Sequence, residues 1–368
     1  MNIGIITHYD VHNHGAVLQL TALKRVLKKL GHEAKALRFD KNYDFLGHDK
    51  KAKYSIGLGS VGIYLGYLRE NGLSKTIYNF KKRRALRGFL SRYGIIGDYY
   101  SEAADVDLTI VGSDEVFALH TGPTPIFFGY AAPSRRVISY AGSFGPTVIE
   151  DIDRLNCRSF VAGGLRGMEA LSVRDENSRS VVERLLGFSP KRVCDPVLLY
   201  GYEQELRGGN PMSGGKPYLL VYAYDARMND PAETEAIRAY AKAHGLEVVS
   251  PGFFHSWADR NVDCDPEKLL LWFKHAQGVV TDTFHGTVMS IIAGTPMAVK
   301  TRDNANKILA LLDEHGLADR RVVDFNSLDA VFGRAINWEK VNSAVVEHRN
   351  QSLNWLSEAI DGRKREKH

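Results

Sequence analysis

The strongest constraint on the fold is a unit that occurs twice in this sequence: an apolar strand, a polar loop, a helix and a second strand. In the segment 279–299, VVTDTFHGTVMSIIAGTPMAV, an apolar run passes into polar residues, a helix opens at Gly286, Gly294 ends it, and Pro296 starts the next strand. Ligands gather at the carboxyl end of the first strand of such a unit, and the N-terminus of its helix attracts anions. His285 lies at that junction, where it either transfers protons or only bonds to the backbone at the start of the helix.

The N-terminal residues contain the same unit. Residues 3–7 form an apolar strand, the loop HYDVHNHG follows, a helix is predicted over about 16–30, and residues 34–39 resume an extended pattern. The loop lacks the G-x-G-x-x-G fingerprint, which argues against a tightly held dinucleotide. The loop also carries side chains that can bind a metal: His8, Asp10, His12 and His14. Because a flexible loop without cysteines gives such a site weak support, we expect no bound metal.

Three further apolar strands, 108–111, 137–141 and 170–173, also end in polar or glycine-containing loops. In a parallel sheet the carboxyl ends of these strands lie at one edge, so their loops should converge. The third strand delivers Arg174, which is followed by two acidic residues. This arginine fits two roles: it binds an anion, or it forms a structural ion pair with the neighbouring acids.

The alternation of strands and helices is interrupted by the glycine-, proline- and charge-rich segment GYEQELRGGNPMSGGKP at 201–217. The chain has 368 residues, of which 44% are hydrophobic, so it is long enough for two domains of ordinary size. We therefore expect an α/β protein with two Rossmann-like domains, 1–205 and 216–337, that face a cleft. The remaining segment, 338–368, is predicted to form a helix that crosses back to the first domain, followed by a basic tail.

Six motifs follow one another along the chain: Asn13-His14-Gly15-Ala16 with Gln19, IVGSDEVF at 110–117, ISYAGSFG at 138–145, LSVRDENS at 171–178, CDPVLL at 194–199 and TDTFHGT at 281–287. Together they resemble the polysaccharide pyruvyl transferase family. The resemblance implies a fold of the GT-B kind with the site in the cleft. It also implies an enzyme that moves the pyruvyl group of phosphoenolpyruvate onto two hydroxyls of a sugar, leaving a cyclic ketal and releasing phosphate. Phosphoenolpyruvate is then a co-substrate, and no cofactor is expected.

The chemistry of this transfer suggests a role for each site residue. The enol carbon gains a proton and the hydroxyls lose theirs, so His285 is the predicted general acid or base, with Arg174 as the second catalytic residue. A carboxylate and a phosphate need cations and backbone donors, and the predicted donor-binding residues are Arg174, Thr283, His285, Gly286, Lys300, Arg302 and Lys307. Short polar groups at strand ends suit a neutral sugar, and the predicted acceptor-binding residues are Asn13, His14, Gly15, Gln19, Ser113, Asp114, Glu115 and Ser143.

The sequence departs from the family pattern at two places. One branch of the family carries Arg-Leu-His where this chain has Thr-Phe-His at 283–285, so an arginine beside the histidine is missing. Three cations after the next strand either replace that charge or form an ordinary solvated edge: Lys300, Arg302 and Lys307. Many relatives carry Gln and Trp at the positions of Glu115 and Phe117, so the identity of the acceptor sugar is not carried over from the family.

Three widely spaced cysteines, Cys157, Cys194 and Cys264, are odd in number and indicate a reducing compartment rather than a disulfide framework. The segment MNIGIITHYD enters a strand at once, so we expect no signal peptide. The sequence contains no uncharged apolar run of about 18 residues, the length that indicates a spanning helix. We therefore expect a cytoplasmic protein.

The net charge of +5 is modest, but basic residues concentrate in 50–68 and 81–92. Lysines beside a glycine-rich aromatic stretch suit an anionic membrane surface, such as the inner face of the membrane, where a lipid-linked sugar acceptor would be found. The alternative is a helix packed on the body of the first domain. Because no recognised nucleic-acid-binding module accompanies these residues, nucleic acid is not an expected partner.

Two other classes of function stay open on the sequence. A GT-B fold also serves nucleotide-sugar glycosyltransferases, and a basic cleft with His285 and Arg174 would suit a nucleotide diphosphate. Thr283, in place of the arginine, is also compatible with a binding protein that performs no catalysis. Release of nucleotide, of phosphate or of neither distinguishes the three.

Overall fold

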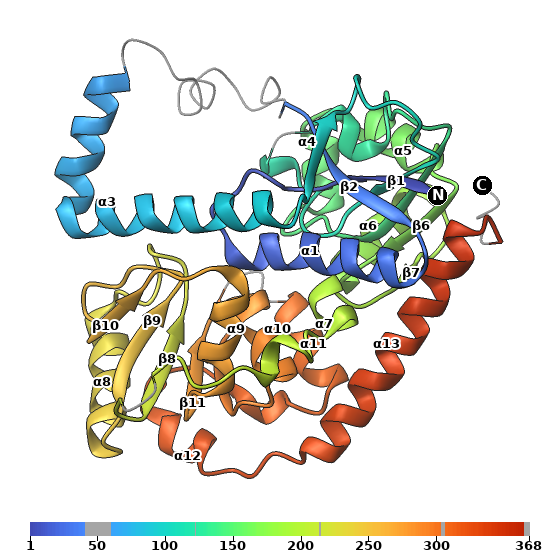
Figure 1. Cartoon of the computed structure of the whole chain (residues 1–368). Coiled ribbons are helices and arrows are strands. Elements are labelled where there is room, and N and C mark those ends of the chain that lie inside the picture. Colours follow the sequence, from blue (N-terminus) through green and yellow to red (C-terminus); the bar gives the residue numbers. More distant parts are fainter. Residues whose placement is uncertain (41–59, 122, 213–214, 303–305, 364–368) are drawn as a thin grey trace.

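The computed structural model describes residues 1–40, 60–121, 123–212, 215–302 and 306–363, with the backbone alone for 60–71. These residues form two parallel β-sheets with helices packed around them (Figure 1). We refer to the parts built on the two sheets as the first and the second domain. The first sheet ends with a strand at Arg192 and the second begins at Tyr218, and the segment between them contains the predicted linker at 201–217.

Within the described residues, the first sheet has seven strands in the spatial order β3-β2-β1-β4-β5-β6-β7, and neighbouring strands are parallel. The strands are β1 Asn2–Ile6, β2 Glu33–Arg38, β3 Ile96–Tyr99, β4 Leu108–Val111, β5 Arg136–Gly142, β6 Ala170–Val173 and β7 Lys191–Arg192. The second sheet has six described strands in the order β10-β9-β8-β11-β12-β13, again all parallel. They are β8 Tyr218–Tyr222, β9 Glu247–Pro251, β10 Arg260–Val262, β11 Gly278–Thr281, β12 Met297–Lys300 and β13 Arg321–Val322.

The helices of the first domain are α1 His14–Lys29, α3 Ser60–Arg92, α4 Ile149–Arg154, α5 Arg158–Arg166, α6 Glu176–Leu186 and α7 Pro196–Tyr200. Those that follow are α8 Pro231–Ala243, α9 Pro266–Lys274, α10 Phe284–Ala293, α11 Asn306–Glu314, α12 Leu328–Phe332 and α13 Trp338–Ile360. Short 3-10 helices occur at Leu119–Thr121, Pro125–Phe128, Glu205–Arg207, Ala318–Arg320 and Phe325–Ser327.

Polar caps explain where several of these helices begin. The side chains of Asn13, Asp175 and Thr283 each accept a hydrogen bond from a backbone amide in the first turn of α1, α6 and α10. At the other end, Gly187 and Gly294 adopt the left-handed conformation that closes α6 and α10. The turn after each strand is therefore held in one conformation, which positions the residues that follow the strand.

The two sheets have the same strand order. In each, the first strand lies at the centre, the next two strands add on one side and the later strands add on the other. The order reverses between β1 and β4 in the first sheet and between β8 and β11 in the second. In open α/β sheets ligands bind outside the carboxyl ends of the strands at such a reversal. The fold therefore contains two potential ligand-binding edges.

The central strands are buried on both faces, as parallel strands covered by helices must be. All residues of β4, β6, β8 and β11 are buried. One large apolar cluster joins the two domains, because it includes residues of α1 and α7 together with residues of α9 and α10. The domains are thus held against each other by a continuous core beneath the cleft.

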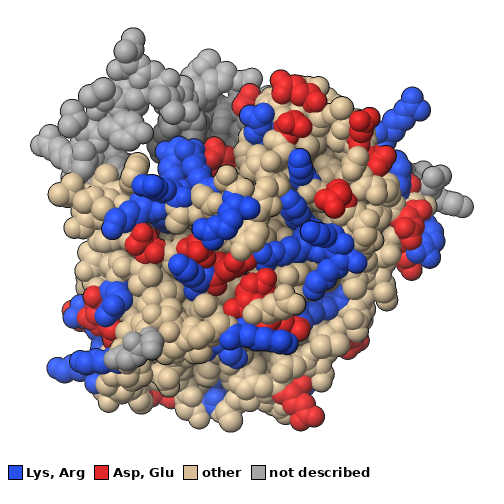
Figure 2. Space-filling view, viewed as in Figure 1, with Lys and Arg blue, Asp and Glu red and all other residues tan. Residues whose placement is uncertain are grey.

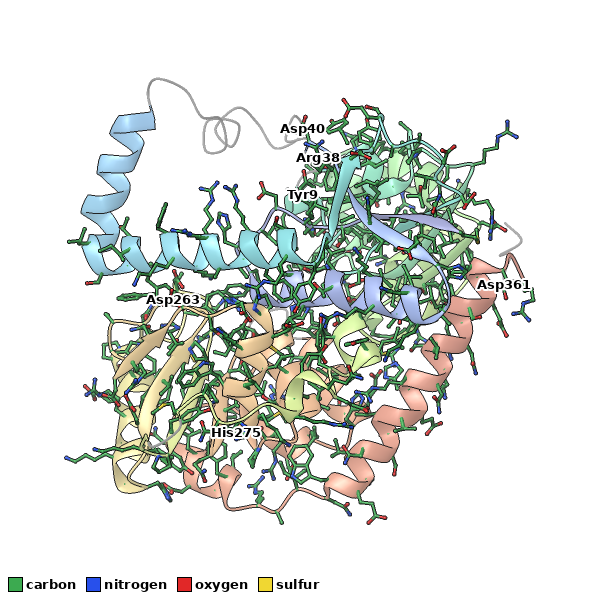
Figure 3. All side chains as sticks on the ribbon, viewed as in Figure 1. Tyr9, Arg38, Asp40, Asp263, His275 and Asp361 are labelled. Carbon is green, nitrogen blue, oxygen red and sulfur yellow. The ribbon has the colours of Figure 1, made fainter. Side chains whose placement is uncertain are left out.

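The last helix, α13, returns from the second domain to the first, as predicted (Figure 1). Its Ser352 hydroxyl accepts a hydrogen bond of 2.9 Å from the backbone amide of Cys194. Near its end, Arg136 of the first sheet donates to the carbonyl of Ile360 at 2.9 Å. Asp361, directly after the helix, lies beside the first domain (Figure 3).

Helix α3 contacts both domains. Its helical geometry is interrupted at Gly72, where φ is 70°, and the part after Gly72 runs along the top of the second domain in Figure 1. The Tyr78 hydroxyl donates to the carbonyl of Val262 at 2.9 Å, and Figure 3 shows the neighbouring Asp263 just below the helix. The predicted membrane contact at 50–68 falls on residues 50–59, which lie outside the described residues, and on a stretch of α3 without described side chains. Among the described residues, the helices are too short or too polar to cross a membrane.

Candidate active site

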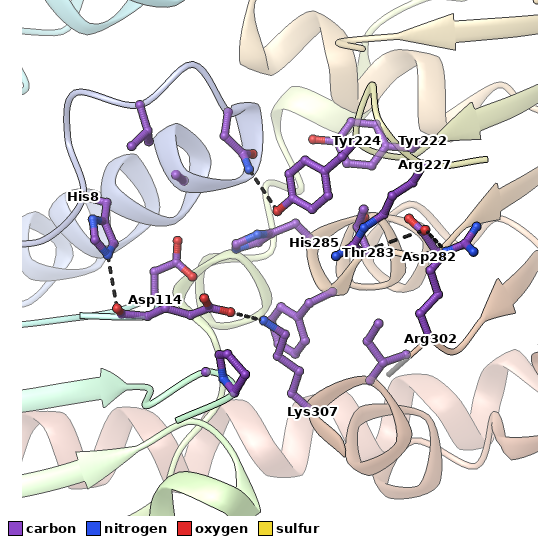
Figure 4. A pocket seen from close by; sticks show the side chains of 18 of the residues that line it. His8, Asp114, Tyr222, Tyr224, Arg227, Asp282, Thr283, His285, Arg302 and Lys307 are labelled. Atoms are coloured by element: carbon purple, nitrogen blue, oxygen red, sulfur yellow. Dashed lines mark hydrogen bonds and ion pairs between the residues drawn. The ribbon is translucent and has the colours of Figure 1, made fainter. Parts of the chain in front are cut away.

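A pocket of about 470 Å³ lies between the two domains, at the reversal points of both sheets (Figure 4). Loops after β1, β4, β5 and β6 supply the first-domain side, and loops after β8, β11 and β12 supply the second-domain side. Eight predicted site residues line it: Asn13, Asp114, Glu115, Arg174, Thr283, His285, Arg302 and Lys307. Acidic and basic side chains both line this pocket, and both kinds are interspersed over the face of the molecule shown in Figure 2.

Two glycines allow His285 to lie at the bottom of this pocket. A Cβ on Gly15 would lie 2.5 Å from Nδ1 of His285, so a larger residue in α1 would displace the ring. A Cβ on Gly286 would lie 2.2 Å from the hydroxyl of Thr281. The Thr283 hydroxyl accepts a hydrogen bond of 2.9 Å from the Gly286 amide, which fixes the first turn of α10. The small residues around His285 are thus required by close packing, in addition to any role that His285 has in the chemistry.

Arg174, at the end of β6, joins two carboxylates beneath His285. Its guanidinium donates to Asp195 at 2.9 Å and to Asp114 at 3.2 Å. Nε2 of His285 lies 3.6 Å from Asp195, too far for a direct hydrogen bond. The side chains of Arg174 and Asp195 are only 1% exposed. Arg174 therefore forms a buried ion pair, but with Asp114 and Asp195 rather than with the acids that follow it in the sequence.

Charge governs the protonation of this cluster. Burial opposes the ionisation of Asp114, but Arg174 and His285 hold the pKa of this carboxyl well below its usual range. Burial likewise opposes the ionisation of Asp195, whose pKa is lowered by His285 and Arg174. Both acids are thus carboxylates at neutral pH. Nε2 of His285 and Nε of Arg174 are buried without a hydrogen-bond partner among the described residues, so a ligand in the pocket can satisfy them.

The second-domain side carries cations that follow β8 and β12. Arg302 donates to Asp282 at 2.5 Å and to Glu233 at 2.8 Å. Arg227 lies 3.9 Å from Asp282, and its side chain is 44% exposed. Burial raises the pKa of Asp282, partly offset by Arg302. One oxygen of Asp282 is buried without a hydrogen-bond partner in the described part of the chain, so this wall offers an acceptor as well as cations.

Two contacts bridge the pocket from one domain to the other. Lys307, at the start of α11, forms an ion pair with Glu115, which follows β4 (Figure 4). Glu115 also lies 3.5 Å from Nε2 of His120. On the other side, the amide of Asn13 donates to the hydroxyl of Tyr224 at 3.3 Å. The two walls are therefore connected by polar contacts, and a bound ligand can replace these contacts with hydrogen bonds or ion pairs to itself.

Several predicted site residues do not line the pocket, and for these the predicted direct contact with a ligand is corrected. Gln19, Ser113 and Ser143 are fully buried. Gln19 donates to Thr7 and accepts from Ser113 at 2.7 Å, and Ser143 donates to Asp175 at 2.5 Å. These side chains turn inward because each satisfies a buried polar partner. They support the loops that reach the pocket.

His14, Gly15, Gly286 and Lys300 also lie behind the lining. Nε2 of His14 is 2.8 Å from the carbonyl of Cys264, and burial lowers the pKa of His14 to about 3. Lys300 pairs with Glu233. Its charge is therefore engaged beside Arg302 rather than directed at the pocket.

Other lining residues were missed by the sequence analysis. Tyr222 is the last residue of β8, and Tyr224 and Arg227 lie in the loop that follows this strand. Since this loop follows the end of β8, the rule applied to the other strands would have found it. Asp282 was quoted within a motif without a role, and Asp195, which meets Arg174 beneath His285, was quoted in the same way.

The described residues contain no group of three or more His, Cys, Asp or Glu side chains placed to hold a metal ion. The histidines of the N-terminal loop point to different partners: Nε2 of His8 lies 3.2 Å from the carbonyl of Glu115, whereas His14 meets Cys264. His8 and His14 therefore do not converge on a common point, as ligands of one metal ion would.

A family model described as polysaccharide pyruvyl transferase matches residues 13–304, most of the chain. No curated protein matches the sequence. Among solved structures, the fold is similar to UDP-GlcNAc 2-epimerase from Methanocaldococcus jannaschii in complex with UDP-GlcNAc and UDP, with a TM-score of 0.50 and 12% identity over 96% of this chain and 99% of that one. It is also similar to a Listeria monocytogenes protein assigned as a UDP-N-acetylglucosamine 2-epimerase, with a TM-score of 0.55 and 11% identity over 100% and 99% of the two chains. These likenesses confirm the predicted two-domain fold of the GT-B kind.

Proposed function

The chain belongs to the polysaccharide pyruvyl transferase family, and we propose that it transfers the pyruvyl group of phosphoenolpyruvate to two hydroxyls of a sugar in surface polysaccharide biosynthesis. The observation that carries the proposal is a single pocket in which His285 lies between a carboxylate-bearing wall and a wall with three cations. The reaction needs a proton-transferring group, an anion site and acceptors for sugar hydroxyls, and this pocket contains groups for each.

The bonds of the reaction can be assigned one by one. A proton adds to the methylene carbon of phosphoenolpyruvate, and the oxygen of one sugar hydroxyl bonds to the central carbon. The oxygen of the second hydroxyl then bonds to the same carbon as the bond to the phosphate oxygen breaks. The two hydroxyls release two protons, one of which balances the proton gained by carbon and the other the proton taken by phosphate. Departure of phosphate requires stabilisation of charge rather than a nucleophilic side chain.

For the donor, the second-domain wall supplies Arg227, Arg302 and Lys307, together with the N-terminus of α10. Arg227 is the most open of these cations, since its side chain is 44% exposed and its nearest acid is 3.9 Å away. These groups replace the arginine that is absent at Thr283. Arg302 and Lys307 are each bound to a carboxylate, so they engage a phosphate by exchanging that partner.

For the acceptor, the first-domain wall supplies Asn13, Asp114 and Glu115. Carboxylates and amides accept hydrogen bonds from hydroxyls, which suits a sugar. The Tyr224 hydroxyl, already bonded to Asn13, extends this polar surface across the pocket.

His285 is the proposed proton donor or acceptor of the reaction. Its Nε2 faces the Asp195 carboxylate at 3.6 Å, a gap that a small rotation of the ring can close. Arg174 holds Asp195 and Asp114 in place beside it. In this proposal the main role of Arg174 is to position Asp114 and Asp195. Its Nε, which has no hydrogen-bond partner among the described residues, is the atom available to bind phosphoenolpyruvate.

A second candidate is a glycosyltransferase that uses a nucleotide sugar. The observation that favours it is Tyr224, an aromatic side chain 40% exposed at the edge of a pocket with cations, where a base and a diphosphate could lie. Incubation with phosphoenolpyruvate and a panel of lipid-linked and nitrophenyl glycosides tests the first proposal through phosphate release. The same panel with UDP-sugars, scored by release of UDP, tests the second. Release of neither product would indicate a binding protein without catalysis.

A further inference from the structure

After Gly72, helix α3 presents one continuous exposed stripe. Leu73, Ile77 and Phe80 recur at intervals of four and three residues, so they share one face of the helix. They are 67%, 47% and 68% exposed. The same spacing continues to Arg84 and Arg87, both exposed. The stripe is thus apolar in its first half and cationic in its second half.

The opposite face of α3 is firmly attached. Tyr78 bonds to the second domain, and the ammonium of Lys82 lies 4.1 Å from the centre of the Phe253 ring. Leu86 and Phe89 are buried in the large apolar core. The helix is therefore held in one orientation on both domains, and the exposed stripe is a fixed surface of the folded protein.

Single exposed apolar residues are common on proteins, but three in succession on one helical face are not. Elsewhere on the described surface, Val323 and Val346 are exposed singly. Among the described residues, the cations of the stripe have few acidic partners. Lys81 and Arg84 form no ion pair with the described residues, and Arg87 reaches only Asp10, at 3.9 Å. Lys and Arg side chains gather over this region in Figure 2.

We propose that this stripe docks on an anionic phospholipid bilayer. Leu73, Ile77 and Phe80 would enter the boundary between headgroups and acyl chains, and Arg84, Arg87 and the adjacent Lys81 would contact the phosphates. A second copy of the chain fits less well, because a parallel pairing places cation against cation and an antiparallel pairing places cations against apolar side chains. An anionic lipid surface matches both halves of the stripe.

The stripe ends near the pocket. Arg87 contacts Asp10, and Asp10 lies in the loop whose His8, Val11 and Asn13 line the acceptor side. If the proposed function holds, docking brings that side of the pocket to the membrane, where a lipid-linked sugar is presented. The docking itself does not depend on which reaction the pocket performs.

Flotation of the full-length protein with vesicles tests the proposal. One set of vesicles is phosphatidylcholine alone, and the other is an equal mixture of phosphatidylcholine and phosphatidylglycerol. The apolar variant is Leu73→Ser/Ile77→Ser/Phe80→Ser, and the basic variant is Lys81→Gln/Arg84→Gln. The matched controls are Val323→Ser/Val346→Ser and Arg154→Gln/Arg184→Gln, which alter exposed residues elsewhere.

We expect the wild-type protein to float with the mixed vesicles and not with the neutral ones. Each stripe variant should bind the mixed vesicles on the order of tenfold more weakly, while both controls bind as the wild type does. Equal binding by the stripe variants and the wild type, or no binding by the wild type, would overturn the proposal. A wild-type dimer that the apolar variant converts to monomer, without vesicle binding, would instead identify a self-association surface. Turnover of soluble glycosides by the stripe variants should be unchanged, so a failure of the proposed reaction is distinguishable from a failure of docking.

Discussion

The two walls of the pocket are built at equivalent points of two sheets with the same strand order, yet their chemistry differs. The first-domain wall presents Asp114 and Glu115, and its arginine, Arg174, is neutralised between two carboxylates. The second-domain wall presents His285 and cations that follow β8 and β12. The shared fold places loops at the cleft, but the residues of each loop decide which charge a ligand meets. We infer that the acids of the first wall and the cations of the second wall bind different substrates, with Nε of Arg174, at the base of the pocket, assigned to the donor.

The largest expected effect concerns the histidine of the second wall. Because a positioned acid or base contributes typically about 10²- to 10⁴-fold, His285→Gln should lose turnover on that scale while the fold survives. Phosphate release and melting temperature, measured together, check this prediction. If His285 only supports its helix, the variant loses stability of about 1 kcal/mol and turns over normally, and the proton must come from another group.

The second prediction compares an arginine from each wall. Arg174→Lys keeps the charge but cannot bridge Asp114 and Asp195 with the same fork, so the free energy of unfolding should fall by about 1–3 kcal/mol. Arg227→Gln alters a largely exposed side chain and should leave stability within about 0.5 kcal/mol. Denaturant unfolding measures both. Arg174→Lys should also weaken the binding of phosphoenolpyruvate. If the variant binds phosphoenolpyruvate as tightly as the wild-type protein does, Arg174 is not part of the donor site.

The third prediction uses a contact between the two domains behind the pocket, where His14, at the start of α1, meets Cys264 of the second domain. Burial lowers the pKa of His14 to about 3, so the unfolded state binds a proton below about pH 6.5 that the folded state does not. Stability should therefore fall as pH decreases from about 6.5, by about 2 kcal/mol at pH 5 from this residue alone. His14→Gln should flatten that part of the curve, as measured by unfolding at pH 7 and pH 5. An unchanged slope in the variant would assign the acid sensitivity to other groups.

The smallest expected effect concerns the ion pair across the pocket. Glu115 occupies Lys307, so Glu115→Gln should free this cation and strengthen the binding of phosphoenolpyruvate by roughly twofold to fivefold, since partly exposed pairs contribute under about 1 kcal/mol. Calorimetric titration with phosphoenolpyruvate and with inorganic phosphate checks this. Weaker donor binding in the variant would show that Glu115 belongs to the donor site rather than competing with it.

Much of the fold follows from local pattern. The strands at 108–111 and 170–173 and the helix that begins at 338 lie where the sequence predicted them. These elements end at capping residues and glycines. The spacing of apolar residues reflects one buried face in the helix and burial on both faces in the strands. The position of His285 at the strand-to-helix junction follows from the same pattern.

The direction of side chains within the site does not follow from local pattern. Ser113 and Ser143 follow strand ends as the lining residues do, and Gln19 lies one turn into α1, but all three turn inward, to partners up to 94 residues away in the chain. The bridge from Arg174 to Asp195 likewise depends on the adjacency of β6 and β7. Such contacts depend on the packing of distant segments, which a single sequence does not specify.

The central claim is that the two walls bind different substrates, and the most direct test is a pair of apparent Michaelis constants in two variants. Asp114→Asn alters the first wall and Arg227→Gln the second, and each removes one charge that lines the pocket. We predict a crossed result: Asp114→Asn raises the constant for the sugar more than that for phosphoenolpyruvate, and Arg227→Gln does the opposite. The reverse pattern, or the same substrate affected in both variants, would contradict the account.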